Sequence, residues 1–323
     1  MTPLLGVALW IGSRRWPVGL KLESHNPSGS IKYRTAQGLM SGLEESGTLR
    51  PGVHLVESTS GNLGVALAFL SQARGYRFTA VTDPKTDPAV LGRIEEMGGQ
   101  TIRVTKPDAE GGYLLSRLAV VSQLLVEEPG AIWPNQYENP SNPAVHYRET
   151  APEIYRQCPD VDAVFVATST GGTLAGVGRY LRRVAPAVRV IGVDVRGSRV
   201  FGLPGGKRLV TGIGSSRPST FLRLGDYNDV MIIDDREAIV TCHQLRNELG
   251  IGLGGSSGAV IAACGRYLAD NPWIRRPVCI CPDGESNYLN TLYNPAWLDR
   301  HGLDPDGHPG RIAFGDVRAV SRA

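Results

Sequence analysis

Short runs of apolar and β-branched residues alternate along the chain with longer segments in which apolar residues recur every three to four positions. The short runs are typical of buried β-strands, and the longer segments are typical of helices with one buried face. Strands that alternate with helices predict parallel sheets covered by helices on both faces. The expected strands are 53–57, 78–82, 101–104, 163–167, 188–194, 230–233 and 278–281. The expected helices are 31–45, 62–74, 89–97, 113–127, 172–184, 236–249 and 256–268.

The composition is that of a globular protein of one or two domains, with 323 residues of which 41% are hydrophobic. Its 34 basic and 31 acidic residues leave a net charge of +3, which gives no support for a nucleic-acid or membrane-surface partner. No run of about 18 apolar residues occurs, so we expect no membrane-spanning helix. The apolar segment 2–12 lacks a preceding basic stretch and a cleavage site, and it does not resemble a signal peptide.

The cysteines and histidines suggest neither disulfides nor a metal site. The five cysteines are odd in number and scattered along the chain, which favours a reducing, cytoplasmic location. Cys279 and Cys281 alternate within an apolar run, and we expect them to be buried strand residues. The six histidines have no metal-ligand spacing, so no metal is expected.

Lys32 stands out because only five of the 34 basic residues are lysines. Arginine stays protonated and non-nucleophilic, so a reaction that needs an amine nucleophile must use one of these few lysines. Lys32 follows the turn-forming residues 27–30 and comes at the start of a predicted helix, where its side chain would reach a ligand. The alternative is a surface charge, which is the usual place of a lysine.

Segment 169–173 has the composition of an anion-binding turn. It follows the predicted strand 163–167 and opens a helix, so its small residues would let backbone N–H groups close on an anion at the positive end of that helix. It lacks the Gly-Lys-Ser/Thr ending of a nucleotide-binding loop, which makes ATP a poor candidate. The alternative is an ordinary glycine-rich turn. Its residues are Ser169, Thr170, Gly171, Gly172 and Thr173.

Two further segments rich in glycine and serine open predicted helices. Segment 58–64 contains Ser60 and Asn62, and segment 254–258 contains Ser256. Taken alone, each of these side chains would be explained by capping of its helix, since serine and asparagine are preferred N-cap residues. The order of all four segments along the chain is more informative than any one of them.

The four segments, in this order, resemble those of the fold-type II pyridoxal-phosphate enzymes, the family of cysteine synthase, cystathionine β-synthase and threonine synthase. The resemblance covers residues 2–292 and includes the motif Pro-Asp-Gly-Glu-Ser-Asn-Tyr-Leu at 282–289. It implies a pyridoxal 5'-phosphate cofactor in the cleft between two three-layer α/β domains. The smaller domain would be 24–134, and the larger would combine 1–23, as its first strand, with 135–323. A homodimer is the assembly expected of the family.

The same resemblance implies roles for individual residues. Lys32 would hold the cofactor through its amine and then act as general base at the substrate Cα. Asn62 would lie beside the ring hydroxyl, the 169–173 turn would bind the phosphate, and Ser256 would hydrogen-bond to the pyridine nitrogen. A serine there keeps that nitrogen neutral, which suits β-elimination and β-replacement. The substrate carboxylate would be bound by Thr59, Ser60 and Gln136, although Gln136 also fits an ordinary turn glutamine.

Several residues depart from the pattern of the cysteine synthases. Tyr137 stands in place of phenylalanine, Ser169 in place of the first glycine of the phosphate turn, and Arg217 in place of an apolar residue near the mouth of the site. Leu63 and Tyr33 also differ from the residues usual in those enzymes. The added hydroxyls and the guanidinium group suit a reactant larger than sulfide and negatively charged.

Four stretches resemble one subgroup, the N-(2-amino-2-carboxyethyl)-L-glutamate synthases, which are also called 2,3-diaminopropionate synthases. The resemblance implies O-phospho-L-serine and L-glutamate as substrates. It also implies a separate NAD-dependent dehydrogenase that releases L-2,3-diaminopropionate for siderophores or peptide antibiotics. The stretches are 54–64, 107–114, 135–137 and 193–198.

Two other functions stay open at the level of the sequence. A cysteine synthase that uses O-acetylserine or O-phosphoserine is the alternative enzyme. A non-catalytic regulatory protein that binds the cofactor is the alternative of another class, but the joint presence of Lys32, Asn62, Gln136 and Ser256 favours turnover. An absorbance scan during addition of O-phosphoserine separates these two classes, because only an enzyme would convert the substrate at its cofactor.

Overall fold

The computed structural model describes residues 1–108, 112–305 and 312–319. The chain divides into a large unit, Met1–His25 with His146–Ala323, and a small unit, Asn26–Val145. Each unit has its own sheet and its own hydrophobic core. The limits expected for the smaller domain, 24 and 134, stay a prediction.

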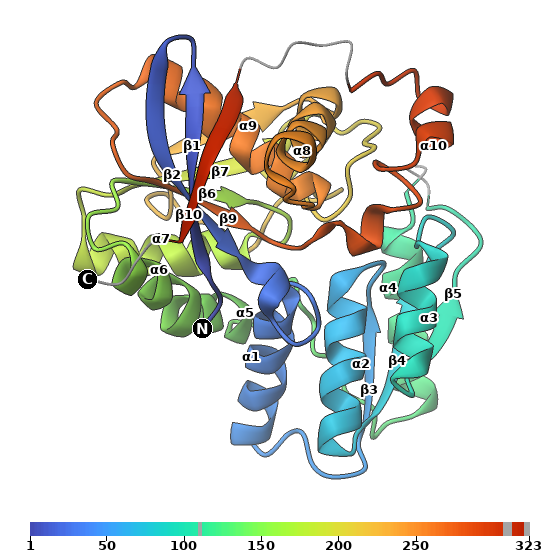
Figure 1. The fold of residues 1–323 in the computed structure, drawn as a ribbon. Helices are drawn as coiled ribbons and strands as arrows, with labels where there is room; N and C mark the ends of the chain where they lie inside the picture. Colours follow the sequence, from blue (N-terminus) through green and yellow to red (C-terminus); the bar gives the residue numbers. More distant parts are fainter. Residues whose placement is uncertain (109–111, 306–311, 320–323) are drawn as a thin grey trace. The chain divides into compact units, whose positions relative to one another are not determined.

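The small unit is a three-layer α/β arrangement around a parallel sheet in the order β3-β4-β5 (Figure 1). Successive residues of a strand point to opposite faces. Leu55 of β3 packs with α1, α2 and α3, whereas its neighbour Val56 packs with Val121 of α4 on the other face. The strands are β3 (His54–Ser58), β4 (Arg77–Thr82) and β5 (Gln100–Arg103). The helices are α1 (Lys32–Glu45), α2 (Asn62–Arg74), α3 (Pro88–Glu96), α4 (Leu114–Glu127) and α5 (Ser141–Val145).

The large unit contains a mixed sheet of seven strands among the described residues, in the order β10-β1-β2-β9-β6-β7-β8. In this sheet, β2, β9, β6, β7 and β8 are parallel to one another. β1 pairs antiparallel with both β2 and β10. The strands are β1 (Leu4–Ile11), β2 (Arg14–Leu22), β6 (Ala163–Ala167), β7 (Arg189–Val195), β8 (Asp229–Ile233), β9 (Pro277–Cys281) and β10 (Ala313–Ala319). The helical segments are η1 (Glu23–His25), η2 (His146–Thr150), α6 (Ala151–Gln157), α7 (Gly172–Val184), α8 (Asp235–Leu249), α9 (Gly255–Asp270), η3 (Glu285–Tyr288) and α10 (Pro295–Arg300).

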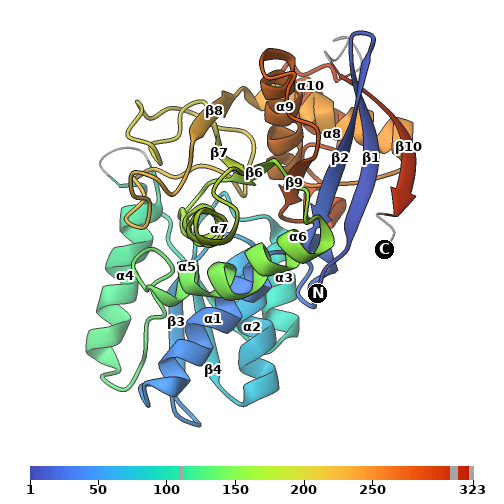
Figure 2. The same cartoon turned by 90° about the vertical axis from the view of Figure 1, so that its left-hand side faces the viewer.

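Helices cover both faces of this larger sheet (Figure 2). Phe165 of β6 and Val193 of β7 pack with α8 and α9 in the main core. On the opposite face, a Cβ at Gly192 would come within 2.9 Å of Leu174, which places α7 against β7. The large unit therefore also has three layers, as the sequence predicts.

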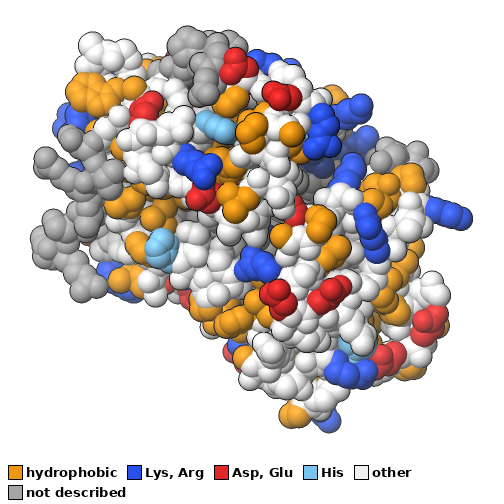
Figure 3. Space-filling view, turned by 45° about the vertical axis from the view of Figure 1, so that its right-hand side comes forward, with side chains coloured by type: hydrophobic (Ala, Val, Ile, Leu, Met, Phe, Trp, Pro, Cys, Tyr) orange, Lys and Arg blue, Asp and Glu red, His pale blue; other side chains and the backbone are white. Residues whose placement is uncertain are grey.

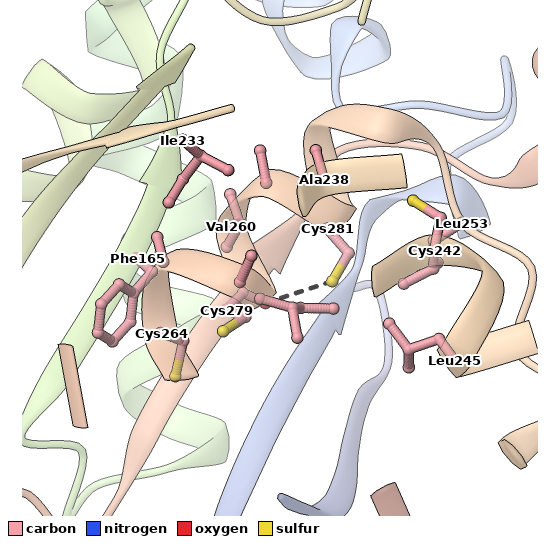
Figure 4. Packing of buried hydrophobic residues seen from close by; sticks show 14 of the residues in the cluster. Phe165, Ile233, Ala238, Cys242, Leu245, Leu253, Val260, Cys264, Cys279 and Cys281 are labelled. Carbon is pink, nitrogen blue, oxygen red and sulfur yellow. Dashed lines mark hydrogen bonds between the residues drawn. The ribbon is translucent and has the colours of Figure 1, made fainter. Parts of the chain in front are cut away.

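The cysteines are free, as expected, and four of the five are buried. Figure 4 shows Cys264, Cys279 and Cys281 among apolar side chains of the core, with the Cys281 thiol donating to the carbonyl of Cys279. Burial raises the pKa of Cys279 and Cys281 well above that of an exposed thiol, so neither is a ready nucleophile. The prediction of buried strand cysteines is confirmed.

Each strand and helix expected from the apolar pattern is present, with bounds within two residues of the expected ones. The elements that the pattern did not predict are β1, which only the family resemblance implied, β2, β10, the short helices α5, α6 and α10, and the short segments η1, η2 and η3. β2 begins with exposed arginines and contains Pro17, and it is placed by pairing with β1 and β9 rather than by an apolar run of its own.

Candidate active site

Lys32 is the first residue of α1 and follows a turn in which Gly29 has a φ of 81°. Its backbone N–H donates to Ser30 Oγ at 3.3 Å, which ties the helix start to the turn. The side chain is partly buried, and desolvation lowers the pKa of the amine to about 8. Within the described part of the chain, the amine has no hydrogen-bond or ion-pair partner. Such an amine is less protonated near neutral pH than an exposed lysine, which makes it a better nucleophile.

Lys21 has the opposite environment. It is fully buried in the large unit, where Nζ donates to Thr2 O at 2.7 Å, to Glu153 Oε2 at 2.8 Å and to Gln157 Oε1 at 2.8 Å. These three acceptors match the three hydrogens of an ammonium group. Lys21 is therefore held as a structural residue by its buried hydrogen bonds, whereas the Lys32 amine has no such partner among the described residues.

The loop between β3 and α2, together with Asn62 at the start of α2, carries three of the predicted site residues. Thr59 is buried, and its Oγ1 accepts hydrogen bonds from Gly64 N at 3.0 Å and from Gly61 N at 3.4 Å. Ser60 is exposed and Asn62 is partly buried. The N-cap position is Gly61, which has no side-chain cap. The backbone N–H of Gly64 at the start of α2 is bonded by Thr59, and not by Ser60 or Asn62 as a capping role would predict. An anion would be favoured at this positive helix end.

Gln136 lies against the same loop. It is buried, and its Nε2 donates to Ser58 O at 3.1 Å. Asn142 Nδ2 donates to Gln136 O at 2.7 Å, which fixes the backbone from the other side. One amide hydrogen of Gln136 is used in this way, and a primary amide has two. Tyr137, the next residue, is partly buried.

In the large unit, the turn between β6 and α7 has the backbone of a phosphate cradle. Gly171 has a φ of 88°, and a Cβ at this position would overlap Ser219 Oγ, so only glycine fits. Ser219 Oγ donates to Thr170 O at 2.6 Å and holds the turn in this shape. The first N–H groups of α7 then lie at a positive helix end next to a tight turn, a common site for phosphate.

The hydroxyls of this turn make contacts of their own. Ser169 Oγ donates to Gly214 O at 3.1 Å, and Thr170 Oγ1 accepts from Gly172 N at 3.3 Å. Thr173 Oγ1 lies 3.2 Å from Nε2 of the buried His146. The donors left for an anion therefore include backbone N–H groups at the start of α7, rather than the Ser169 hydroxyl.

Ser256, the second residue of α9, is fully buried, and its hydroxyl has no hydrogen-bond partner among the described residues. The N-cap of α9 is Gly254, which has no side-chain cap, so Ser256 does not cap its helix. A buried hydroxyl without a partner costs about 1–3 kcal/mol, and native proteins rarely leave one without a reason. A ligand atom that hydrogen-bonds to Ser256 would remove this cost.

The 212–217 loop joins these features within the large unit. Gly212 has a φ of 81°, and a Cβ there would lie 3.6 Å from Ser256 Oγ. Gly214 N donates to Thr168 O at 2.8 Å, beside the 169–173 turn. Arg217 follows in the same loop, with its backbone N–H bonded to Ser215 Oγ at 3.2 Å and its side chain partly buried.

The predicted site residues thus form two groups, one in each unit. The group in the small unit is Lys32, Thr59, Ser60, Asn62, Gln136 and Tyr137. The group in the large unit is Ser169, Thr170, Gly171, Gly172, Thr173, Arg217 and Ser256.

Two buried residues, Tyr288 and Glu57, were not among the predicted site residues. Tyr288 donates from its hydroxyl to Asp283 Oδ2 at 2.6 Å, and the Tyr288 hydroxyl would lie 3.3 Å from a Cβ at Gly212. Glu57 is fully buried at the end of β3, directly before the loop. An acidic residue inside an apolar strand was the one available signal for Glu57, while the contact of Tyr288 with the 212–217 loop depends on folding.

Figure 3 shows basic and acidic side chains interspersed with neutral and apolar ones on the visible face. No group of metal-ligating side chains occurs among the residues that the structure describes. None of the described helices has the length and apolar character needed to cross a membrane. Of the stretch 107–114, residues 109–111 lie outside the described residues.

A family model for "Pyridoxal-phosphate dependent enzyme" matches residues 2–283. The chain belongs to this family, and it is an enzyme that uses pyridoxal 5'-phosphate. It is 43% identical over 301 residues to an N-(2-amino-2-carboxyethyl)-L-glutamate synthase of Ralstonia nicotianae, a match that covers 93% of this chain and 89% of the relative.

Two solved structures show the same fold. O-ureido-L-serine synthase aligns with a TM-score of 0.80 and 30% identity, over 92% of this chain and 96% of that one. An O-acetylserine dependent cystathionine β-synthase from Helicobacter pylori aligns with a TM-score of 0.81 and 30% identity, over 86% and 90% of the two chains. The fold-type II assignment made from four short segments is confirmed.

The residues present fit this cofactor. The unpartnered amine of Lys32 suits an aldehyde, and the cradle at Gly171 suits a phosphate. The unpartnered buried hydroxyl of Ser256 suits a ring nitrogen. Each match rests on a different chemical group of the cofactor, which makes chance agreement a poor explanation.

Proposed function

We propose that the enzyme replaces the β-substituent of O-phospho-L-serine with the amino group of L-glutamate. The Cβ–O bond of phosphoserine breaks and a Cβ–N bond to glutamate forms. Inorganic phosphate leaves, and the glutamate nitrogen loses one proton. The product is N-(2-amino-2-carboxyethyl)-L-glutamate, the compound in the name of the relative that is 43% identical to this chain.

The observation that carries this proposal is the environment of Lys32. Its amine is desolvated, has a pKa lowered to about 8 and lacks a partner within the described residues. When bound, the cofactor supplies an electron sink that makes the substrate Cα–H bond acidic. Lys32, once released from the cofactor, would take the Cα proton and later return it to the same carbon.

Other residues of the chain would bind and orient the substrate. The loop that contains Thr59, Ser60 and Asn62 lies at the N-terminal end of α2, a favourable position for the substrate carboxylate. Gln136 lies next to that loop and would supply a further donor to the carboxylate. The cradle at Gly171 would hold the cofactor phosphate, and Ser256 the ring nitrogen. Asn62 would contact the ring hydroxyl.

Two residues support an anionic reactant over sulfide. Arg217 lies on the 212–217 loop, which is bonded to the 169–173 turn through Gly214 and passes close to Ser256 at Gly212. A guanidinium group binds a phosphate or carboxylate through two parallel hydrogen bonds. Tyr137 directly follows Gln136 and adds a phenol hydroxyl where cysteine synthases carry phenylalanine.

A competition experiment tests the proposal. The purified holoenzyme receives equal O-phospho-L-serine and O-acetyl-L-serine together with L-glutamate and sulfide, and the products are identified by mass spectrometry. The expected product is N-(2-amino-2-carboxyethyl)-L-glutamate, formed with release of inorganic phosphate. Cysteine as the dominant product would assign the enzyme to the cysteine synthases. Absence of any turnover would favour a regulatory protein that binds the cofactor.

We also propose the setting in which the enzyme works. It would be a cytoplasmic homodimer, consistent with its free cysteines and its family. Its product would be oxidised by a separate NAD-dependent dehydrogenase to release L-2,3-diaminopropionate, for a siderophore or a peptide antibiotic. Sedimentation of the holoenzyme tests the dimer, and a coupled assay with such a dehydrogenase from the same genome tests the next step.

A further inference from the structure

Glu57 is a fully buried carboxyl group that accepts three hydrogen bonds from two chain segments of the small unit. Its Oε1 accepts from Trp133 Nε1 at 2.9 Å and from Ser58 N at 2.9 Å, and its Oε2 accepts from Gln136 N at 3.2 Å. A buried carboxylate needs such donors, because an unpaired charge in the interior is very unfavourable. Glu57 thus links β3 to the segment that leads to Gln136.

The rest of this segment is also tied to β3. Ile132 pairs with Leu55 in a parallel bridge, with hydrogen bonds from Ile132 N to His54 O and from Val56 N to Ile132 O. Beyond that bridge, the ties are the contacts of Glu57 and the hydrogen bond from Gln136 to Ser58 O. Beyond the bridge at Ile132, the carboxylate of Glu57 therefore holds the backbone of Gln136 beside the end of β3.

We propose that Glu57 is a positioning residue for substrate binding, which holds Gln136 and the adjoining 58–62 loop in the arrangement that receives the substrate carboxylate. This inference rests on the proposed function, because that function gives Gln136 and the loop their role. The hydrogen bonds of Glu57 among the described residues are to Trp133, to Ser58 N and to the backbone of Gln136. Its effect on catalysis would therefore be exerted through Gln136.

The charge of Glu57 decides how strongly its carboxyl group holds the backbone N–H of Gln136. An ionised carboxylate has acceptor sites on both oxygens, whereas a protonated one must direct an O–H outward from one of them. Oε2 has a single donor, at the longer distance of 3.2 Å, so the added proton would go there and face the N–H of Gln136. Protonation would therefore weaken the contact to Gln136 first and leave those to Trp133 and Ser58.

The surroundings of Glu57 raise its pKa, so that the carboxyl group gains or loses its proton near neutral pH. Burial raises the pKa of Glu57 to about 7, against the opposing effects of hydrogen bonds from Trp133, Gln136 and Ser58 and of the Arg117 charge. Arg117 of α4 is itself paired with Asp83, which follows β4, at 3.3 Å. The segment 132–136 carries no titratable side chain. Among the described residues, the charged groups that bear on Glu57 are thus Arg117 and, through it, Asp83.

The first arm of the test uses the cofactor-free protein and no substrate. Trp133 fluorescence is obtained as the difference between the protein and its Trp133→Phe variant, because the chain has five tryptophans. We expect this signal to titrate with a midpoint near pH 7 and to become independent of pH in Glu57→Gln. A difference signal that is flat between pH 5 and 9 (a span of about two pKa units on each side of that midpoint) would overturn the inference, whatever the substrate proves to be.

The second arm measures KM and kcat of the holoenzyme with whichever activated serine it converts. Glu57→Gln, which imitates the protonated state, should raise KM by about tenfold at pH 8, the effect of losing a charge-assisted contact, with a smaller change in kcat. The ratio of KM between variant and parent should fall toward one below pH 6. This ratio cancels the ionisation of the substrate's own phosphate. A ratio that does not depend on pH would reduce Glu57 to a purely structural role.

Two control variants complete the design. Glu128→Gln removes a carboxylate that contacts His54 at the opposite end of β3 and does not touch Gln136, and it should leave KM and its pH profile unchanged. Glu57→Asp keeps the ionisation but shortens the reach, so it should raise KM and retain a pH inflection. If the enzyme rejects O-phospho-L-serine but passes both arms with another donor, the proposed substrate fails and the role of Glu57 stands.

Discussion

Lys21 Nζ lies 2.8 Å from Glu153 Oε2 inside the large unit, with further bonds to the backbone of Thr2 and to Gln157. Lys32 in the small unit has no comparable partner among the described residues, and its pKa is lowered to about 8. A chain with only five lysines thus uses one as a buried structural charge and one as a candidate nucleophile.

Lys32→Ala should yield a folded protein without the visible absorbance of the bound cofactor and without turnover. The cofactor-free variant should be as stable as the parent, because no hydrogen bond of the amine is lost. Lys21→Met should instead lose about 3 kcal/mol of stability, since it removes the buried ammonium group that pairs with Glu153 and bonds to Thr2 O and Gln157. Borohydride reduction of the holoenzyme followed by peptide mapping should label Lys32. Labelling of Lys21, Lys85, Lys106 or Lys207 would contradict the whole assignment of the site.

The rate of cofactor capture by the cofactor-free protein should rise with pH and reach half its maximum near pH 8. Only the unprotonated amine attacks an aldehyde, and desolvation favours the neutral form of Lys32. Stopped-flow absorbance between pH 6 and 10, a range of about two units on each side of this pKa, measures this rate. A midpoint near the value of an exposed lysine, about 10.4, would mean that the Lys32 amine is solvated.

Ser256→Ala should weaken cofactor binding without destabilising the cofactor-free protein. The hydroxyl is buried and unpartnered among the described residues, so its removal should stabilise that form by up to about 1 kcal/mol. Loss of the hydrogen bond to the cofactor should raise its Kd by about two- to tenfold. Ser257→Ala is the matched control, because Ser257 is equally buried but its Oγ donates to Asp283 O. Equal Kd values for the two variants would remove Ser256 from the site.

Arg217→Ala should lower kcat/KM by about ten- to hundredfold, the effect of a lost charge-assisted pair. Arg217→Lys should recover part of this loss, since it restores the charge but not the two parallel hydrogen bonds. Arg196→Ala, which removes an exposed arginine, is the control. A rise in KM confined to O-phosphoserine assigns Arg217 to the donor phosphate, and one confined to glutamate assigns it to the acceptor. Unchanged constants would identify a surface charge.

Glu57→Gln should become more stable relative to the parent as the pH rises. The pKa of Glu57 is raised from 4.5 to about 7 in the folded protein, so the folded state binds the proton more tightly than the unfolded state. The resulting stabilisation is complete below pH 4.5 and is lost as the pH rises through 7. The parent should therefore lose about 3 kcal/mol relative to Glu57→Gln over this range. Urea unfolding of both proteins at several pH values measures the difference, and parallel curves would show that Glu57 does not titrate in this window.

The amino-acid sequence by itself determined the α/β class, the bounds of most strands and helices, the cofactor and the family. The class and the bounds are local features, because apolar periodicity and glycine-rich turns depend on neighbouring residues in the chain. The cofactor and the family followed from the resemblance of four short segments to known enzymes. It could not reveal that Thr59, rather than Ser60 or Asn62, stabilises the start of α2, or that the Ser169 hydroxyl is bonded to Gly214. Those outcomes depend on which donor and acceptor meet after folding.

Tertiary structure also decided which of the chemically equivalent residues are free to react. Lys21 and Lys32 look alike in the sequence, yet only Lys21 is surrounded by acceptors brought together from positions up to 136 residues away. Glu57 likewise became a candidate only when Trp133 and Gln136 were found on its carboxylate. Burial and long-range hydrogen bonds fix the charge and reactivity of such groups, and neither can be calculated from a linear pattern.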